Sequence, residues 1–165
     1  MLFSVTDGIV PIESVLARIE VKSKLTASEL KDAVLGAMQF KALGMAIDDL
    51  TDAEELRCLF AFGTDLANGG KTEMVRLREA FEAHNVDSKE PPIVALCVVG
   101  RGCWLHSSKT DGSPYWAYCP ADAEFSEVLT FVGVLLNSFP NLRAKRRSAR
   151  LGSYVVDMSK VTDAV

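Results

Sequence analysis

The sequence predicts an α/β protein in which a mixed β-sheet is flanked by helices. Residues 14–23 alternate apolar and polar side chains, which is the period of a half-buried strand. A capping-box pattern at 26–29 then opens a segment with helical spacing. Residues 93–99 form a continuous apolar run, which is typical of a strand buried on both faces.

In the N-terminal part of the chain, a short strand is expected over 2–5, before the strand at 14–23. A helix is expected to begin at Ala27, because Thr26 and Glu29 have the capping-box spacing, and Gly44 indicates its end.

A second strand is expected over 57–62, and a helix from about Thr72 to His84 follows it. Helical spacing predicts four buried side chains on that helix, namely Met74, Val75, Leu77 and Phe81.

The second half of the chain supplies the rest of the sheet. The buried strand at 93–99 is expected to pair with 103–106, and 115–119 to form an edge strand. A last helix is predicted from Asp122 to Phe139, apolar on most sides and stopped by Pro140. A final short strand is expected at 154–156. No linker divides the chain, so we expect a single domain over residues 1–165.

Composition narrows the class of protein. A hydrophobic content of 48% over 165 residues excludes a disordered chain. The apolar runs are too short to cross a bilayer and no signal peptide is recognisable, so a cytoplasmic protein without a membrane partner is expected. The net charge of −4 does not indicate a generally basic nucleic-acid binder. Near the C-terminus lies a basic run, formed by Arg143, Lys145, Arg146, Arg147 and Arg150. Its positive charge could contact phosphates, and the alternative interpretation is a solvated segment.

The cysteines form no C-x-x-C pair, and reduced thiols are expected for all four of them. The set Cys97, Cys103, His106 and Cys119 fits no common zinc spacing.

Glu20 and Lys22 are the most informative residues of the chain. On an extended strand the Glu20 carboxylate and the Lys22 ammonium project side by side, with Arg18 just before them. A carboxylate can hold a divalent metal while a lysine stabilises charge on an attacking water or a phosphate. The alternative interpretation is an ordinary ion pair on a surface strand.

The segment 11–26 resembles the core of the restriction-endonuclease-like superfamily, the PD-(D/E)xK nucleases. It is similar to a bacterial subfamily of uncharacterised domains, in which an apolar strand ends in Glu-Val-Lys-Ser and a helix opened by Leu-Thr follows. Residues 59–66, the turn at 98–102 and the helix before residues 150–154 resemble that subfamily as well. The resemblance implies a restriction-endonuclease-like core, with Glu20 as a magnesium ligand and Lys22 as the residue that polarises the attacking water.

The family also needs an aspartate on the preceding strand, because one carboxylate holds a hard dication weakly. In the subfamily this aspartate lies before the segment that matches the start of this chain, so the core is expected to be N-terminally incomplete. Asp7 is the candidate substitute as second metal ligand, although it sits beside Gly8 in a predicted turn. Glu13 is the weaker candidate, because strand alternation places it on the face opposite Glu20.

Two functions follow from these expectations. The first is a nuclease that cleaves DNA phosphodiesters with Mg²⁺ or Mn²⁺, its activity in doubt because the first metal-binding aspartate is missing. The alternative is a non-catalytic interaction module that retains the nuclease fold. A core without its first strands exposes a sheet edge, so a homo-oligomer formed through that edge is also expected.

Overall fold

A computed structural model describes residues 15–45, 55–66, 72–87 and 89–145. Its elements are β1 (Ala17–Lys22), α1 (Ala27–Met45), β2 (Leu56–Ala61), α2 (Glu73–Ala83), β3 (Ala95–Val98), β4 (Gly102–Ser108), β5 (Pro114–Pro120) and α3 (Ser126–Lys145). The strands form one five-stranded sheet in the order β1-β2-β3-β4-β5. Strands β1, β2 and β3 are parallel, whereas β4 is antiparallel to both of its neighbours, β3 and β5, which confirms an α/β protein with a mixed sheet. The strands expected at 2–5 and 154–156 lie outside the described residues.

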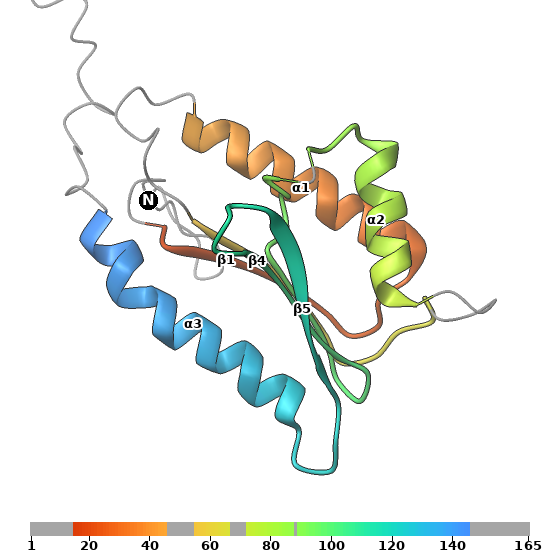
Figure 1. Ribbon diagram of the computed structural model, residues 1–165. Helices are drawn as coiled ribbons and strands as arrows, with labels where there is room; N and C mark the ends of the chain where they lie inside the picture. Colours follow the sequence, from red (N-terminus) through yellow and green to blue (C-terminus); the bar gives the residue numbers. More distant parts are fainter. Residues whose placement is uncertain (1–14, 46–54, 67–71, 88, 146–165) are drawn as a thin grey trace, which may run out of the picture.

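The two faces of the sheet are covered unequally. Figure 1 shows α1 and α2 on one face and α3 alone on the other. The α1–α2 side holds the larger apolar core, which includes Leu59 and Leu96 of the central strands. On the other side, α3 lies over β3, β4 and β5, and its Phe131 packs against Cys97 and Cys103. Among the described helices, α3 is therefore centred over β3, β4 and β5 and not over β1.

The capping box predicted at the start of α1 is confirmed, and α2 has an N-cap as well. The Thr26 backbone N–H donates to Glu29 Oε2 at 3.0 Å, and the Glu29 N–H donates to Thr26 Oγ1 at 3.2 Å. This reciprocal pair satisfies two donors that the first turn of α1 would otherwise leave free. At α2, the Thr72 hydroxyl accepts from the Val75 N–H. The start of α1 therefore follows from local sequence alone.

Two expectations about helices are wrong. Val75 is 40% exposed, and the buried side of α2 is formed by Leu77, Ala80 and Phe81, with Met74 half-buried. The helix α3 also continues through Pro140 to Lys145. Proline removes the donor to the carbonyl four residues earlier, but burial of Leu142 on the following turn holds the last stretch of α3 against the protein.

Strand β1 has the predicted alternation. In the register of β1 with β2, Glu20 pairs with Leu59 and Ile19 pairs with Cys58. Paired residues share a face, so Glu20 points to the α1 side and Ile19 to the α3 side. Since α3 does not reach β1, Ile19 is 43% exposed and Val21 57% exposed. The apolar side of this strand is thus the more exposed one.

Candidate functional site

The side chains of Arg18, Glu20 and Lys22 lie together on the α1 side of β1, as the alternation predicts. Arg18 donates to Glu20 Oε2 at 2.7 Å, and the Lys22 ammonium lies 3.1 Å from Glu20 Oε1. All three side chains are 20–29% exposed. The Arg18 guanidinium packs close to α1, 3.0 Å from where a side chain at Gly36 would begin, so a larger residue there would displace it. We call these three residues the β1 ion cluster.

The β1 ion cluster is a poor cation site. Both oxygens of Glu20 are already in ion pairs. Two cations and one anion give the cluster a net charge of +1, whereas a hard dication needs several negatively charged or carbonyl oxygens. Within the described ranges, no group of three or more His, Cys, Asp or Glu residues is arranged to hold a metal ion. Asp7 and Glu13 lie outside the described residues, and so do Arg146, Arg147 and Arg150 of the basic run.

The cysteines line the α3 side of the sheet. Cys97 pairs with Cys103 across β3 and β4, and Cys103 pairs with Cys119 across β4 and β5. His106 lies on the opposite face, where its ring contacts Trp116. The structure therefore does not bring these cysteines and His106 into one zinc set. Burial raises the pKa of the Cys58 thiol to about 12, which makes that thiol unreactive at neutral pH.

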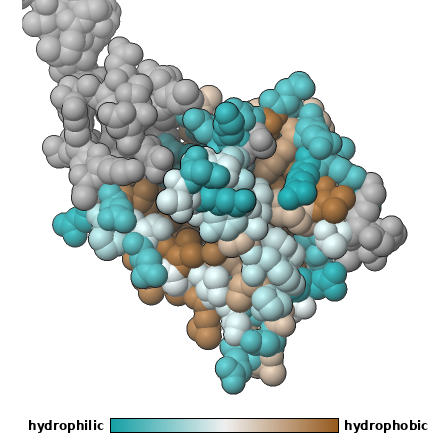
Figure 2. All heavy atoms as spheres, viewed as in Figure 1, coloured by the Kyte–Doolittle hydropathy of each residue, from teal (hydrophilic) through white to brown (hydrophobic). Residues whose placement is uncertain are grey.

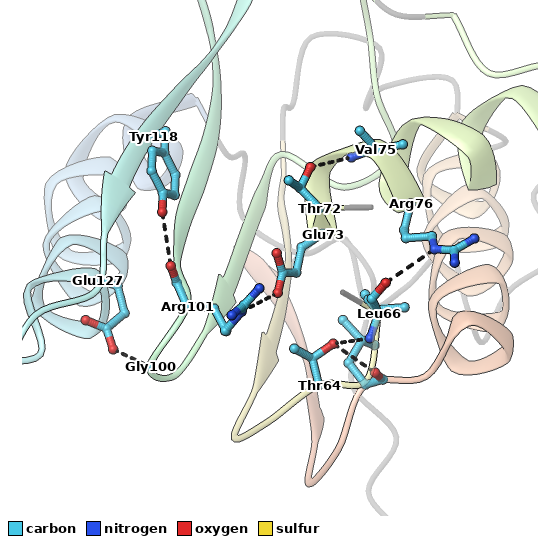
Figure 3. A network of polar contacts seen from close by, with 11 residues as sticks. Thr64, Leu66, Thr72, Glu73, Val75, Arg76, Gly100, Arg101, Tyr118 and Glu127 are labelled. Atoms are coloured by element: carbon cyan, nitrogen blue, oxygen red, sulfur yellow. Dashed lines mark hydrogen bonds and ion pairs between the residues drawn. The ribbon is translucent and has the colours of Figure 1, made fainter. Parts of the chain in front are cut away.

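A second polar cluster lies at the carboxyl ends of β2 and β3, and Figure 3 shows its side chains converging there. The Arg101 guanidinium donates to the buried Glu73 at 2.7 Å, and this hydrogen bond raises the pKa of Arg101. The Tyr118 hydroxyl donates to the Arg101 carbonyl at 3.1 Å. Sequence analysis missed this cluster, although Glu73 directly follows a helix-capping threonine.

Glu127 belongs to the same cluster. It is fully buried in the first turn of α3, and its Oε1 accepts the Gly100 N–H at 2.9 Å. Its Oε2 has no hydrogen-bond partner among the described residues. The bonds from Glu127, Glu73 and Tyr118 tie the β3–β4 turn to α3, α2 and β5. The cluster thereby fixes the turn between the two halves of the sheet.

Beside these polar clusters lies a large exposed apolar surface on the α3 side. Leu129, Val132, Leu136 and Phe139 follow helical spacing along one flank of α3. The other flank carries Thr130, whose hydroxyl contacts Cys119 on β5 at 3.2 Å. The apolar flank therefore lies on the side of α3 that is turned away from β5.

The uncovered part of the sheet continues this surface. Phe60 of β2 packs on Phe131 at the base of α3, and Phe62 packs edge-on against Phe60. Ile19 and Val21 lie beyond them on β1. Figure 2 shows hydrophobic residues gathered along α3. We define the apolar face as Ile19, Val21, Phe62, Leu129, Val132, Leu136 and Phe139, all 43–68% exposed.

Comparison with known proteins adds no family to this description. No protein-family model, curated protein or solved structure matches the chain. Within the described residues, no helix has the length and apolar character needed to span a membrane.

Proposed function

We propose that this chain is a non-catalytic interaction module, built on a nuclease-like α/β fold, that binds its partner through the apolar face. The proposal rests on the size of the apolar face. With about 200 Å² for a large side chain that is completely exposed, the seven residues leave on the order of 700 Å² of side-chain surface uncovered. The largest apolar patch on a typical monomer is roughly 300–600 Å², and larger ones mark interaction sites.

The state of Glu20 supports the absence of catalysis. A magnesium ligand must offer free oxygens, but Arg18 and Lys22 each engage one oxygen of this carboxylate. Lys22 is likewise held by Glu20, so its ammonium is not directed at a separate water or phosphate. The β1 ion cluster is better suited to joining an edge strand to the helix above it.

A second candidate function is metal-dependent cleavage of DNA. It is favoured by one observation: Glu20 and Lys22 share a face of β1, as that chemistry requires. It would need a further carboxylate, for which Asp7 is the candidate, and release of at least one of the two ion pairs.

A cleavage assay separates the two candidates. Supercoiled plasmid is incubated with the purified chain and Mg²⁺ or Mn²⁺, beside the variants Glu20→Gln, Lys22→Ala and Asp7→Asn. Glu82→Gln, a change of an exposed glutamate on α2, is the matched control. We expect no nicking above the level of the Glu20→Gln variant. Cleavage that is retained by Glu82→Gln and abolished by both Glu20→Gln and Lys22→Ala would contradict the interaction module and support the nuclease.

The expected homo-oligomer through a sheet edge also stays a prediction. Strand β1 is an edge strand of the described sheet, and no other described strand pairs with its outer side.

A further inference from the structure

We infer that the apolar face is the contact of a symmetric homodimer, in which α3 of each copy lies against the exposed apolar side of β1 of the other. The inference rests on the proposed function and names its partner, a second copy of this chain. It differs from pairing through the sheet edge because side chains, and not the backbone of β1, make the contact.

The area of the apolar face agrees with a stable dimer. Each partner in an interface of standard size contributes about 800 Å², and the apolar face supplies on the order of 700 Å² from seven side chains alone. Neighbouring polar and backbone atoms at the rim make up the rest. Obligate homodimer interfaces are also the more apolar ones.

The exposed part of the sheet beside α3 is β1. Its Ile19 and Val21 are 43% and 57% exposed, whereas on β2 Cys58 is buried and Phe60 packs on Phe131. Phe62, directly after β2, is 64% exposed. Strand β1 is therefore the part of the sheet that is open to a helix of the partner subunit.

The sequence of α3 indicates that this helix is buried on more than one side. Residues 128–142 contain no Asp, Glu, Lys or Arg, yet only one side of α3 packs on its own sheet. A helix that is apolar on most sides is normally surrounded by protein. In the dimer, the exposed flank Leu129, Val132, Leu136 and Phe139 is covered by β1 of the partner subunit.

A second copy explains both uncovered surfaces with one contact. In a two-fold dimer each patch meets the complementary patch of the other copy, so α3 and the apolar side of β1 are covered together. The residues that directly follow α3 are a poor alternative, because Arg146, Arg147 and Arg150 would bring charge onto an uncharged surface.

Sedimentation velocity over a range of protein concentrations tests the dimer, with one charged substitution on each half of the contact. The variants are Leu136→Glu on α3 and Val21→Glu on β1, whose side chains are 68% and 57% exposed. Leu43→Glu, at a residue of α1 that is 60% exposed, is the matched control outside the apolar face. We expect dimers for the parent chain and the control, and association at least ~100-fold weaker for the two face variants. Circular dichroism checks that all variants keep the fold.

A mixing experiment tests the geometry. Copies with Leu136→Glu are mixed with copies carrying Val21→Lys, so that a glutamate on one α3 faces a lysine on the other β1. We expect the mixture to form heterodimers although each variant alone is monomeric. Two monomeric variants that also fail to associate in the mixture would overturn this arrangement.

The remaining outcomes separate this inference from the proposed function. A dimer that is unaffected by both face variants overturns the inference and points to the β1 edge. A monomeric parent that binds the dye 1-anilinonaphthalene-8-sulfonate, with less binding after Leu136→Glu, overturns the dimer but retains a surface for another partner. A monomeric parent that binds no dye has its apolar face covered by its own chain, which overturns both.

Discussion

Glu20 illustrates how one residue's surroundings decide its chemistry. Alternation along an extended strand is enough to place its carboxylate beside Lys22, and the structure has this pair at 3.1 Å. The second ion pair, with Arg18 at 2.7 Å, uses the remaining oxygen of the carboxylate. The same three residue types could form a metal site or a structural ion cluster, and the engagement of both oxygens favours the structural role.

Glu127 is the residue for which we expect the clearest difference between two substitutions. Glu127→Gln keeps an oxygen for the Gly100 N–H and nearly the same side-chain volume, so we expect a free energy of unfolding within about 1 kcal/mol of that of the parent. Glu127→Ala removes the acceptor and leaves a cavity, so we expect a loss of about 2–4 kcal/mol. Urea unfolding of both variants measures the difference. Equal stability of the two variants would contradict a role for the carboxylate oxygen in holding the β3–β4 turn.

At the scale of elements, α3 begins with a cap that local sequence does supply. Asp122 Oδ2 accepts from the Ser126 hydroxyl at 2.6 Å, and Oδ1 accepts the backbone N–H groups of Glu124 and Ser126 at 3.0 Å. These bonds satisfy donors at the start of the helix. The same element also shows the limit of local rules, since Pro140 lies within α3 and does not end it.

This cap predicts a pH dependence. The hydrogen bonds from the Ser126 hydroxyl and backbone hold the pKa of Asp122 below its ordinary value. A carboxyl whose pKa is lower in the folded state stabilises the protein above its unfolded pKa, about 4, and loses that contribution as the pH falls through the folded value. We therefore expect the free energy of unfolding of the Asp122→Asn variant to decrease less steeply than that of the parent as the pH falls below ~4. Unfolding curves at several pH values measure this slope.

Asp111 offers a comparison for that experiment. Bonds from Ser113 also lower its pKa, but it lies in the loop between β4 and β5 and caps no helix. Both substitutions should flatten the acid response, whereas only Asp122→Ala, which removes the acceptor oxygens, should also reduce the helical signal of α3. If the free energy of unfolding of Asp122→Asn falls with acid as steeply as that of the parent, Asp122 is excluded as a source of the pH dependence.

For the whole molecule, a homodimer formed through the apolar face links stability to concentration. Association that requires the folded chain stabilises it by mass action, so the melting temperature of the parent is expected to rise with protein concentration. For Leu136→Glu the melting temperature should be independent of concentration. Scanning calorimetry over a hundredfold range of concentration makes this measurement. A parent melting temperature that does not change over that range would contradict a dimer coupled to folding.

The order of elements and most of their bounds could be predicted because they depend on short-range features. The capping box at Thr26 and Glu29, the apolar run that becomes β3 and the alternation in β1 each act over a few residues. The exposed Val75 could not be predicted, because helical spacing identifies an apolar stripe but not the width that a neighbouring element covers.

The sequence by itself determined which residues of β1 share a side, because alternate side chains of an extended strand must point in opposite directions. Only the tertiary structure decided which side is covered. The helix α1 lies over the charged side of β1, whereas α3 is placed over β3, β4 and β5 and leaves Ile19 and Val21 exposed. The physical reason is that the position of a helix over a sheet depends on contacts between residues far apart in the chain, which no local pattern contains.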